Sequence, residues 1–512
     1  MNIPNLQYNE GIWQLIVKDK PFTMLAGEVH NSSASNPKYM EENVWPHLRE
    51  MGLNSVLVPV YWEMIEPIEG KFDFSVISQI IDQARIEGLK LGILWFGLWK
   101  NGLSSYVPSW VKTDPTRFFR AKDMFGKSLD VISPFCQEGI EADSKAFAEL
   151  MSFLKEKDEF ENTVIIVQVE NEVGLLGSDR DYSKKANEKY ALNIPEALAK
   201  KYNISGNWHE VFEKEANEIF MEYAYAKAIE SIAKSGKNVY PLPMLTNAWI
   251  EKYPWRPGTY PSGGPIARYM ELWKMIAPSI DILAPDVYVT DFVGTCEEYT
   301  AQNNPLIIPE HRRDIRHISN VFYAFGKYNA IGFSPFGIED FMVEESKRKG
   351  IGNPQLMKVL NFDSSSWECD KSGQFLKDSY KILGEIMPLL RTYSSQNKVH
   401  SFIRENEHQK GVIIHMDKCD LQIDFMDFEE STPKSSGIIM EIGTNELLVL
   451  GTNFKYSFIS RSAHINIGIL EYSEGEMIDD HYEVERILNG DERYFMIIME
   501  KPQLQKVSWY EY

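Results

Sequence analysis

The feature that most constrains the fold is a regular alternation of short apolar runs with longer amphipathic or charged stretches, from about Pro21 to Leu390. Strands of a parallel sheet are buried on both faces, so they read as continuous apolar runs between helices. Eight runs have this character: Thr23–Ala26, Ser55–Val60, Leu89–Trp95, Val164–Val169, Met244–Asn247, Ile280–Pro285, Leu306–Pro309 and Ala330–Ser334. Eight such strands predict an α/β fold closed into a (β/α)8 TIM barrel.

Stretches between these runs predict helices, because they combine helix-forming residues with apolar positions at helical spacing. The predicted helices are Glu41–Met51 with Pro46 early in it, Val76–Glu87, Ser144–Lys155 and Trp208–Ser235. The last of these is long and rich in Ala, Glu and Lys.

After about Tyr393 the pattern changes to closely spaced short runs, separated by polar or Gly-containing turns. The runs are Gly411–His415, Leu421–Phe425, Gly437–Ile442, Glu446–Leu450, Tyr456–Ile459 and Tyr494–Met499. Such spacing predicts a smaller all-β, sandwich-like domain. We therefore expect a barrel with a short N-terminal extension in residues 1–392 and an all-β accessory domain in residues 393–512. The accessory domain can be a sugar-binding module, an oligomer interface or a cover over the barrel, and a homo-oligomer is compatible with the sequence.

Charge and cysteine usage exclude several classes of function. The formal net charge of −21 repels polyphosphates and anionic membrane surfaces, although it also serves solubility alone. We expect neither a nucleic-acid nor a membrane partner. The four cysteines lack the spacing of zinc sites, which predicts buried free thiols and no metal. Neither a secretory signal nor an apolar run of about 18 residues is evident, so we expect a cytoplasmic protein.

Two carboxylates follow predicted strands at the place where barrel enzymes carry their reactive side chains. Glu172 follows the fourth strand and Glu310 the seventh. Strands four and seven face one another across the mouth of a barrel, so the two carboxyl groups can approach within about 5–5.5 Å, the separation of a retaining glycosidase. Burial and like charge would keep the acid of such a pair protonated until it is needed. An isolated Glu at a strand end is more often a solvated loop residue.

The sequence around Glu172 resembles glycoside hydrolase family 35 of clan A. The resemblance rests on Gln168–Gly174, on Trp62–Phe74, which is shared with family 42, and on Gly27–Ser33. It implies a β-galactosidase in which Glu172 is the acid/base and Asn171 binds the 2-hydroxyl of the sugar. Glu170 is then a supporting residue, although the sequence alone does not choose between the two glutamates.

Further candidates for sugar binding follow the other strands. His30 follows strand one, Asn247 strand five and Tyr288 strand six. The indole of Trp99 follows strand three and can stack on a sugar ring, whereas Trp95 lies inside its strand and is expected in the core. Core packing is the alternative for Trp99, and a structural hydrogen bond is the alternative for His30.

The sequence departs from family 35 at three strand ends. Gly97-Leu98-Trp99 stands where members carry Ala-Glu-Trp with a galactose-binding Glu, and Pro59 stands where they carry Tyr. Both changes weaken the inference to galactose. Tyr61, Glu63 or Lys100 can supply replacement hydrogen bonds.

The third departure surrounds the expected nucleophile. Ile308–Arg313 differs from the usual Ser-Glu-aromatic string, but Glu310 still follows an apolar strand. Arg312 or Arg313 is expected to keep Glu310 ionised. Glu339 is the reserve candidate.

The sequence thus predicts a retaining exo-β-glycosidase, a β-galactosidase without cofactor or metal, acting on a β-galactoside or small oligosaccharide. Glu172 would be the acid/base and Glu310 the nucleophile. The alternatives are another clan A activity, such as a β-glucosidase, β-xylosidase or family 42-like enzyme, and a non-catalytic carbohydrate-binding barrel.

Overall fold

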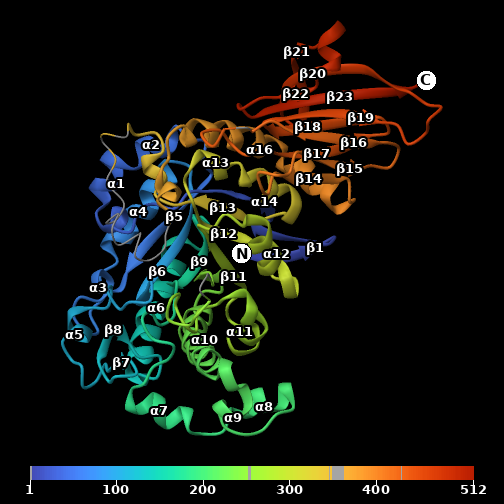
Figure 1. Cartoon of the computed structure of the whole chain (residues 1–512). Coiled ribbons are helices and arrows are strands. Elements are labelled where there is room, and N and C mark those ends of the chain that lie inside the picture. The colour runs from blue at the N-terminus through green and yellow to red at the C-terminus, as the bar shows by residue number, and fades with distance from the viewer. Residues whose placement is uncertain (1–2, 252–254, 345, 347, 349–362, 428) are drawn as a thin grey trace.

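The structure is a computed structural model, and it describes residues 3–251, 255–344, 346, 348, 363–427 and 429–512. Figure 1 shows the two parts of the chain: a barrel surrounded by helices, and a stack of strands (orange to red) beside it. The helix α16 (Ser372–Ser395) runs between them in the sequence. The predicted boundary at residues 392 and 393 falls within this helix, and the domain division stays a prediction.

Eight parallel strands form the barrel, as the apolar runs predicted. They are β4 (Met24–Leu25), β5 (Ser55–Tyr61), β6 (Lys90–Lys100), β9 (Val164–Asn171), β10 (Met244–Trp249), β11 (Ile282–Val287), β12 (Ile307–His311) and β13 (Gly332–Pro335). Their order in the sheet is β4-β13-β12-β11-β10-β9-β6-β5. Backbone hydrogen bonds from Asn54 to Leu25 and from Leu57 to Gly27 join the two ends of this sheet, so the barrel is closed.

Helices cover the outside of the barrel (Figure 1). They are α1 (Pro37–Asn43), α2 (Trp45–Arg49), α3 (Trp62–Ile65), α4 (Ser75–Ile86), α5 (Ser109–Lys112), α6 (Gln137–Asp158), α7 (Lys184–Tyr190), α8 (Glu196–Tyr202), α9 (Trp208–Phe212), α10 (Ala216–Lys237), α11 (Met270–Ile276), α12 (Phe292–Thr300), α13 (Ile315–Ile318) and α14 (Asn320–Tyr328). Short 3-10 helices include η5 (Ile338–Asp340) and η7 (Ser364–Trp367).

Two predicted helices are each divided in the structure. The stretch Glu41–Met51 belongs to α1 and α2, because the first helix ends at Asn43 and Pro46 lies in the first turn of the second. The stretch Trp208–Ser235 divides into α9 and α10, because Glu213 adopts a φ of 49°, which no right-handed helix accommodates.

Two apolar layers hold the barrel together. Its interior is filled by alternate side chains of the strands, among them Leu57, Leu94, Ile166, Leu245 and Ile307. The opposite faces of the same strands pack against the helices in a second, larger cluster. The interior is therefore a packed core, and only the ends of the strands are left to carry polar side chains.

The C-terminal residues form two antiparallel sheets, which confirms the predicted all-β region. One contains β14 (Val399–Ile403), β17 (Ser436–Gly443), β18 (Glu446–Thr452), β23 (Gln503–Glu511), β20 (Ile467–Ile478) and β21 (His481–Ile487), and the other β15 (Gly411–His415), β16 (Asp420–Phe425), β19 (Phe454–Ile459) and β22 (Ile497–Ile498). An apolar core lies between them. The predicted strand Tyr494–Met499 shrinks to β22, since Tyr494 ends a 3-10 helix.

The larger sheet also packs on the barrel helices. Ile438 of β17 lies so close to Gly326 of α14 that a Cβ at residue 326 would come within 2.6 Å of the isoleucine side chain. Met440 and Leu450 belong to the same apolar cluster as the barrel helices. The C-terminal strands are thus docked on the barrel through a buried apolar contact.

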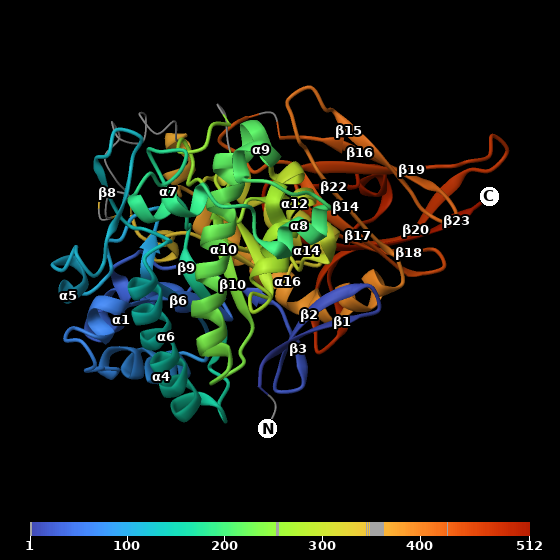
Figure 2. The ribbon, with the colours of Figure 1, turned by 90° about the horizontal axis from the view of Figure 1, so that it is seen from below.

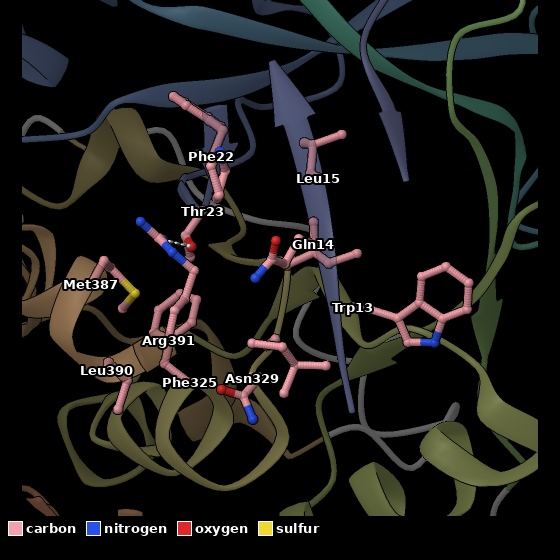
Figure 3. A pocket seen from close by; sticks show the side chains of 14 residues that line it. Trp13, Gln14, Leu15, Phe22, Thr23, Phe325, Asn329, Met387, Leu390 and Arg391 are labelled. Carbon is pink, nitrogen blue, oxygen red and sulfur yellow. Dashed lines mark hydrogen bonds between the residues drawn. The ribbon is translucent and has the colours of Figure 1, made fainter. Parts of the chain in front are cut away.

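A small N-terminal sheet covers the opposite end of the barrel from the predicted site. It consists of β1 (Asn5–Asn9), β2 (Ile12–Val17) and β3 (Lys20–Phe22), and Figure 2 shows it below the barrel. A cavity of about 20 Å³ lies between this sheet, α14 and α16, where Arg391 donates a hydrogen bond of 3.2 Å to Thr23 (Figure 3). This space is on the scale of one water molecule and cannot hold a sugar.

Two other expectations concern the whole chain. The four cysteines are buried and free, as their spacing predicted. None of the helices that the structure describes is both long and apolar enough to cross a membrane.

Candidate functional site

Three acidic side chains meet at the carboxyl ends of the barrel strands. One carboxylate oxygen from each of Glu172, Asp286 and Glu310 lies within 4.8 Å of the others. All three residues are buried. Glu172 and Glu310, which are far apart in the sequence, therefore lie close together, as predicted. Asp286 was not predicted to lie beside them.

Local backbone geometry positions Glu172. The residue follows β9 with a φ of 46°, and Glu170 has a φ of 61°, both in the left-handed region that non-glycine residues rarely adopt. Such strain costs about 1–3 kcal/mol and is concentrated at functional sites. Glu172 reaches Asp286 and Glu310, whereas Glu170, two residues earlier, lies beside Asp143 instead.

Glu310 lies beside Asp286 because β11 and β12 pair in register at these two residues. Tyr288 donates a hydrogen bond of 2.7 Å to Oε2 of Glu310. Burial and the charge of Glu310 raise the pKa of the Tyr288 hydroxyl well above its usual range, so it remains a donor. The other carboxylate oxygen of Glu310 is buried without a hydrogen-bond partner among the described residues.

Asn247 of β10 connects the segments that carry Glu172 and Asp286. Its side-chain oxygen accepts a hydrogen bond of 2.9 Å from the backbone N–H of Glu172, and its amide nitrogen donates to Asp286 at 2.7 Å. The same nitrogen lies 3.3 Å from the side-chain oxygen of Asn171, which Gln168 also contacts at 2.9 Å. The predicted residues Asn171 and Asn247 thus belong to this site.

Two further charged residues, Glu28 and Lys100, are buried near the three acids. Burial and the charge of Glu310 raise the pKa of Glu28 well above its usual range. Burial, Glu310 and a hydrogen bond to Glu172 do the same to the pKa of Asp286. Burial disfavours the charged Lys100, but Glu310 and the other acids outweigh it and hold its pKa above the ordinary value.

Glu170 lies on the outer side of the barrel wall. It accepts hydrogen bonds from the backbone N–H groups of Leu98 (3.1 Å) and Trp99 (2.7 Å) and lies beside Asp143 of α6. Burial and the charge of Asp143 raise the pKa of Glu170 well above its usual range, which favours the protonated carboxyl group. A Cβ at residue 97 would lie 2.5 Å from both acids, which explains why Gly97 stands there.

Two of the predicted sugar-binding residues lie away from the three acids. The Trp99 indole is fully buried in the helix layer, where it donates to the Ile132 carbonyl (2.9 Å) and meets Tyr225 of α10 edge to face. This placement corrects the expectation that Trp99 stacks on the sugar. Glu63 forms an ion pair of 2.8 Å with Lys112, and its side chain is 40% exposed.

His30 and Tyr61 lie between these extremes. The Nε2 of His30 is 2.7 Å from a carboxylate oxygen of Asp340, and its ring meets Phe336 edge to face. The ring of Tyr61 stacks on Tyr106 at 5.6 Å, and its hydroxyl is buried. In the described part of the chain, neither side chain is hydrogen-bonded to the three acids, and only their positions after β4 and at the end of β5 place them at this end of the barrel.

The reserve nucleophile, Glu339, is engaged elsewhere. Both of its oxygens lie within 3.2 Å of the backbone nitrogen of His30, and Ser33 donates to it at 2.6 Å. These contacts hold the loop after β4, whereas Glu310 lies next to Glu172. The structure therefore favours Glu310 of the two candidates.

The two arginines that were expected to act on Glu310 form ion pairs with other acids. Arg312 pairs with Asp314 and Asp363, and Arg313 pairs with Asp340 at 3.1 Å. Lys100 is the cation whose charge acts on Glu310.

Sequence reasoning missed Glu28 and Asp286 and named Lys100 only as a source of replacement hydrogen bonds. Asp286 had a signal, since it ends the apolar run Ile282-Leu-Ala-Pro in the same way as Glu310 ends its own. A second missed feature is the aromatic row beside the acids, where Trp367 of η7 lies 4.9 Å from the ring of Tyr288 and 5.9 Å from Phe336.

The donor set also bears on cofactors. Three carboxylates can coordinate a hard divalent cation, which prefers oxygen ligands. Here, however, Tyr288 and Asn247 already donate to two of them, and Lys100 supplies a positive charge nearby. Beyond the acids themselves, no contact of the described residues points to a metal.

Two separate parts of the chain match known protein families. Residues 14–251 match the family described as Glycosyl hydrolases family 35, and residues 376–499 match a domain of unknown function, DUF5597. The first match covers β9 and Glu172 but ends before Asp286 and Glu310.

Individual relatives are distant. A "Beta-galactosidase" of Xanthomonas manihotis is 27% identical over 184 residues, which are 33% of this chain and 27% of the relative. "Beta-galactosidase 14" of Arabidopsis thaliana is 24% identical over 198 residues, 36% of this chain and 20% of the relative. The matches thus span about a quarter of these relatives. A solved β-galactosidase from Bacillus circulans sp. alkalophilus has a TM-score of 0.49 and 10% identity, covering 95% of this chain and 99% of its own.

The resemblance found in the sequence is therefore confirmed where it was strongest, at the strand ends from Gly27 to Gly174. Residues 14–251 of the chain are thus similar to the glycosyl hydrolases of family 35.

Proposed function

We propose that the protein is a retaining exo-β-glycosidase that releases terminal β-linked galactose, with Glu172 as acid/base and Glu310 as nucleophile. The observation that carries the proposal is the separation of at most 4.8 Å between one carboxylate oxygen of each residue. Retaining glycosidases hold their two carboxyl groups about 5–5.5 Å apart, whereas inverting enzymes need about 6.5–9.5 Å to admit a water molecule.

The first half of the proposed reaction forms a glycosyl-enzyme. A carboxylate oxygen of Glu310 attacks the anomeric carbon while the bond to the leaving oxygen breaks. Glu172 gives its proton to that oxygen, so the aglycone leaves as an alcohol. Tyr288 donates to Oε2 of Glu310, and Oε1 accepts no hydrogen bond from the described residues.

The second half releases the sugar. Glu172, now ionised, takes a proton from water, and the hydroxide oxygen attacks the anomeric carbon from the side of the departed aglycone. The bond to Glu310 breaks and its carboxylate is restored. Two inversions give retained configuration. The residues that remain in place throughout are Asn247, which holds the Glu172 backbone, and Asn171.

Galactose is the proposed sugar because both curated relatives bear the name β-galactosidase. A second clan A activity, on glucosides or xylosides, is the nearest alternative, since Gly97-Leu98-Trp99 lacks the galactose-binding Glu of family 35. A panel of nitrophenyl β-glycosides on the purified protein separates these activities. Binding of sugars without turnover of any panel member would instead support a carbohydrate-binding barrel.

The catalytic assignment is tested with Glu310→Gly. We expect turnover of the preferred nitrophenyl glycoside to fall at least a thousandfold and azide to restore part of it, giving a glycosyl azide of inverted configuration. Glu339→Gly is the matched control: it removes a buried glutamate from a neighbouring strand end and should show no azide rescue. Turnover that persists in Glu310→Gly, or rescue in Glu339→Gly, would exclude the assignment.

A further inference from the structure

Lys100 is held next to the proposed acid/base by the backbone. It ends β6 and pairs with Asn171 of β9. The following residues continue this contact, since Asn101 donates to the Asn171 carbonyl at 3.1 Å and Gly102 to the Glu172 carbonyl at 3.2 Å. The end of β6 is therefore fixed to the segment that carries Glu172.

The ammonium group of Lys100 lies among acids but is bonded to none of them. Only 7% of the residue is exposed, and Nζ lies 4.7 Å from the centre of the Phe96 ring. Within the described part of the chain, Nζ makes no hydrogen bond and no ion pair. The groups whose charges act on it are Glu310, Glu28, Glu172 and Asp286, and its own charge acts on the Tyr106 hydroxyl.

Glu28 is a buried acid whose carboxyl oxygens also lack hydrogen-bond partners. Only 1% of the residue is exposed, and both of its carboxyl oxygens are buried without a hydrogen-bond partner in the described chain. It precedes Val29, whose backbone N–H donates to Leu57, so the backbone at this position is fixed in the barrel wall. A buried polar group without a partner costs about 1–3 kcal/mol, and more when it is charged.

Two such groups near the proposed catalytic pair require partners that the protein does not provide. A sugar hydroxyl can satisfy both, because its oxygen accepts a hydrogen bond from an ammonium group and its hydrogen is donated to a carboxyl oxygen. We propose that Lys100 and Glu28 bind hydroxyl groups of the sugar ring held between Glu172 and Glu310. This inference rests on the proposed function.

The inference also specifies the class of ring. Lys100 is the one cation in this group, and its charge already interacts with Glu310, Glu28, Glu172 and Asp286, so a carboxylate on the ring would be buried without a cation of its own. The ligand is thus a neutral pyranose whose hydroxyl groups reach both Lys100 and Glu28, and uronic acids of the same configuration should bind at least tenfold more weakly.

The test measures sugar binding by calorimetry, without requiring turnover. Wild type, Lys100→Met and Lys100→Arg are titrated with galactose, glucose, xylose and galacturonate. Lys90→Met is the matched control, because Lys90 begins the same strand at its other end and bonds to the carbonyls of Glu161 and Asn162. We expect at least a tenfold loss of affinity in Lys100→Met, partial recovery in Lys100→Arg and wild-type affinity in Lys90→Met.

A second measurement covers the case in which Lys100→Met does not fold. Wild type is titrated with the monodeoxy derivatives of its preferred sugar and compared with Lys100→Arg and Glu28→Gln. If Lys100 contacts a given hydroxyl, removing that hydroxyl from the sugar should lower the affinity of wild type. The same removal should lower the affinity of Lys100→Arg only slightly. Glu28→Gln should identify a hydroxyl by the same criterion.

The outcomes separate the two proposals. Sugar binding that depends on Lys100, without turnover of any glycoside, keeps the inference and overturns the proposed function. The inference is overturned if Lys100→Met binds sugar with wild-type affinity. It is also overturned if, for every deoxy sugar, the loss of binding free energy simply adds to that of the variant. Neither outcome bears on turnover by Glu172 and Glu310. A wild type that binds no sugar of the panel overturns the inference as well.

Discussion

The hydrogen bond from Tyr288 to Glu310 gives the sharpest test of how the proposed nucleophile is held. Tyr288→Phe removes one donor at 2.7 Å and leaves the ring, which lies 4.9 Å from Trp367, in place. Oε1 of Glu310 is already without a partner, so the variant leaves the whole carboxylate without a hydrogen bond from the described residues. The perturbation is therefore confined to one bond at a buried charge.

Its magnitude follows from the type of bond. A hydrogen bond to a charged group contributes about 1.5–3 kcal/mol, and each 1.36 kcal/mol in a barrier is a factor of ten in rate. If the bond orients Glu310 for attack, kcat/KM of Tyr288→Phe should fall about 10- to 150-fold. The loss should appear in the step that forms the glycosyl-enzyme, and therefore also with a dinitrophenyl leaving group that needs no acid.

The assay compares kcat/KM of wild type and Tyr288→Phe on nitrophenyl and dinitrophenyl glycosides. Tyr299→Phe is the control, since Tyr299 is a buried tyrosine that donates to the Pro265 carbonyl at 3.0 Å instead of to Glu310. We expect it to lower the free energy of unfolding by about 1 kcal/mol without changing kcat/KM. A change of less than twofold in folded Tyr288→Phe would refute the positioning role.

Three further predictions follow from the same contacts. In Glu172→Ala, formation of the glycosyl-enzyme should slow strongly for substrates with poor leaving groups but little for dinitrophenyl glycosides. Azide should accelerate the release of the sugar in the second step. Equal losses on both kinds of substrate would contradict the acid/base role. A chelator should leave the turnover of wild type unchanged, because Lys100 supplies the positive charge at the acids; loss of turnover that a divalent cation restores would contradict this. Burial raises the pKa of Glu218 from 4.5 to about 7, so its contribution to stability is full below pH 4.5 and is lost as the pH rises through 7. Urea unfolding of Glu218→Gln should show a flatter pH dependence of the free energy of unfolding between pH 5 and 8, by up to about 3 kcal/mol, and an unaltered slope would refute this.

The barrel was readable from the sequence because buried parallel strands impose continuous apolar runs. Glu310, Asn247 and Tyr288 were predicted by one rule, that polar residues after such runs lie at the carboxyl end of the barrel, whereas the choice of Glu172 over Glu170 came from the family resemblance. The rule applied equally to Asp286, which ends β11 and pairs in register with Glu310. The C-terminal strands β20 and β21 were not predicted. Most side chains of β21 are exposed and several are charged, so this strand has no apolar run that the sequence could show.

The rule fails at the end of β6, where Trp99 was predicted to face the sugar but Lys100 lies near the acids instead. On a regular strand, side chains alternate between the two faces, so the residues after Trp95 can be assigned by counting. In the structure, Trp95 pairs with Val169 but Lys100 pairs with Asn171, so β6 has three more residues than β9 over this interval. An irregularity of this kind changes which side chains face inward. Within this irregular segment the backbone N–H groups of Leu98 and Trp99 bond to the side chain of Glu170 rather than to backbone carbonyls of β9, and Trp99 lies in the helix layer while Lys100 lies near the acids.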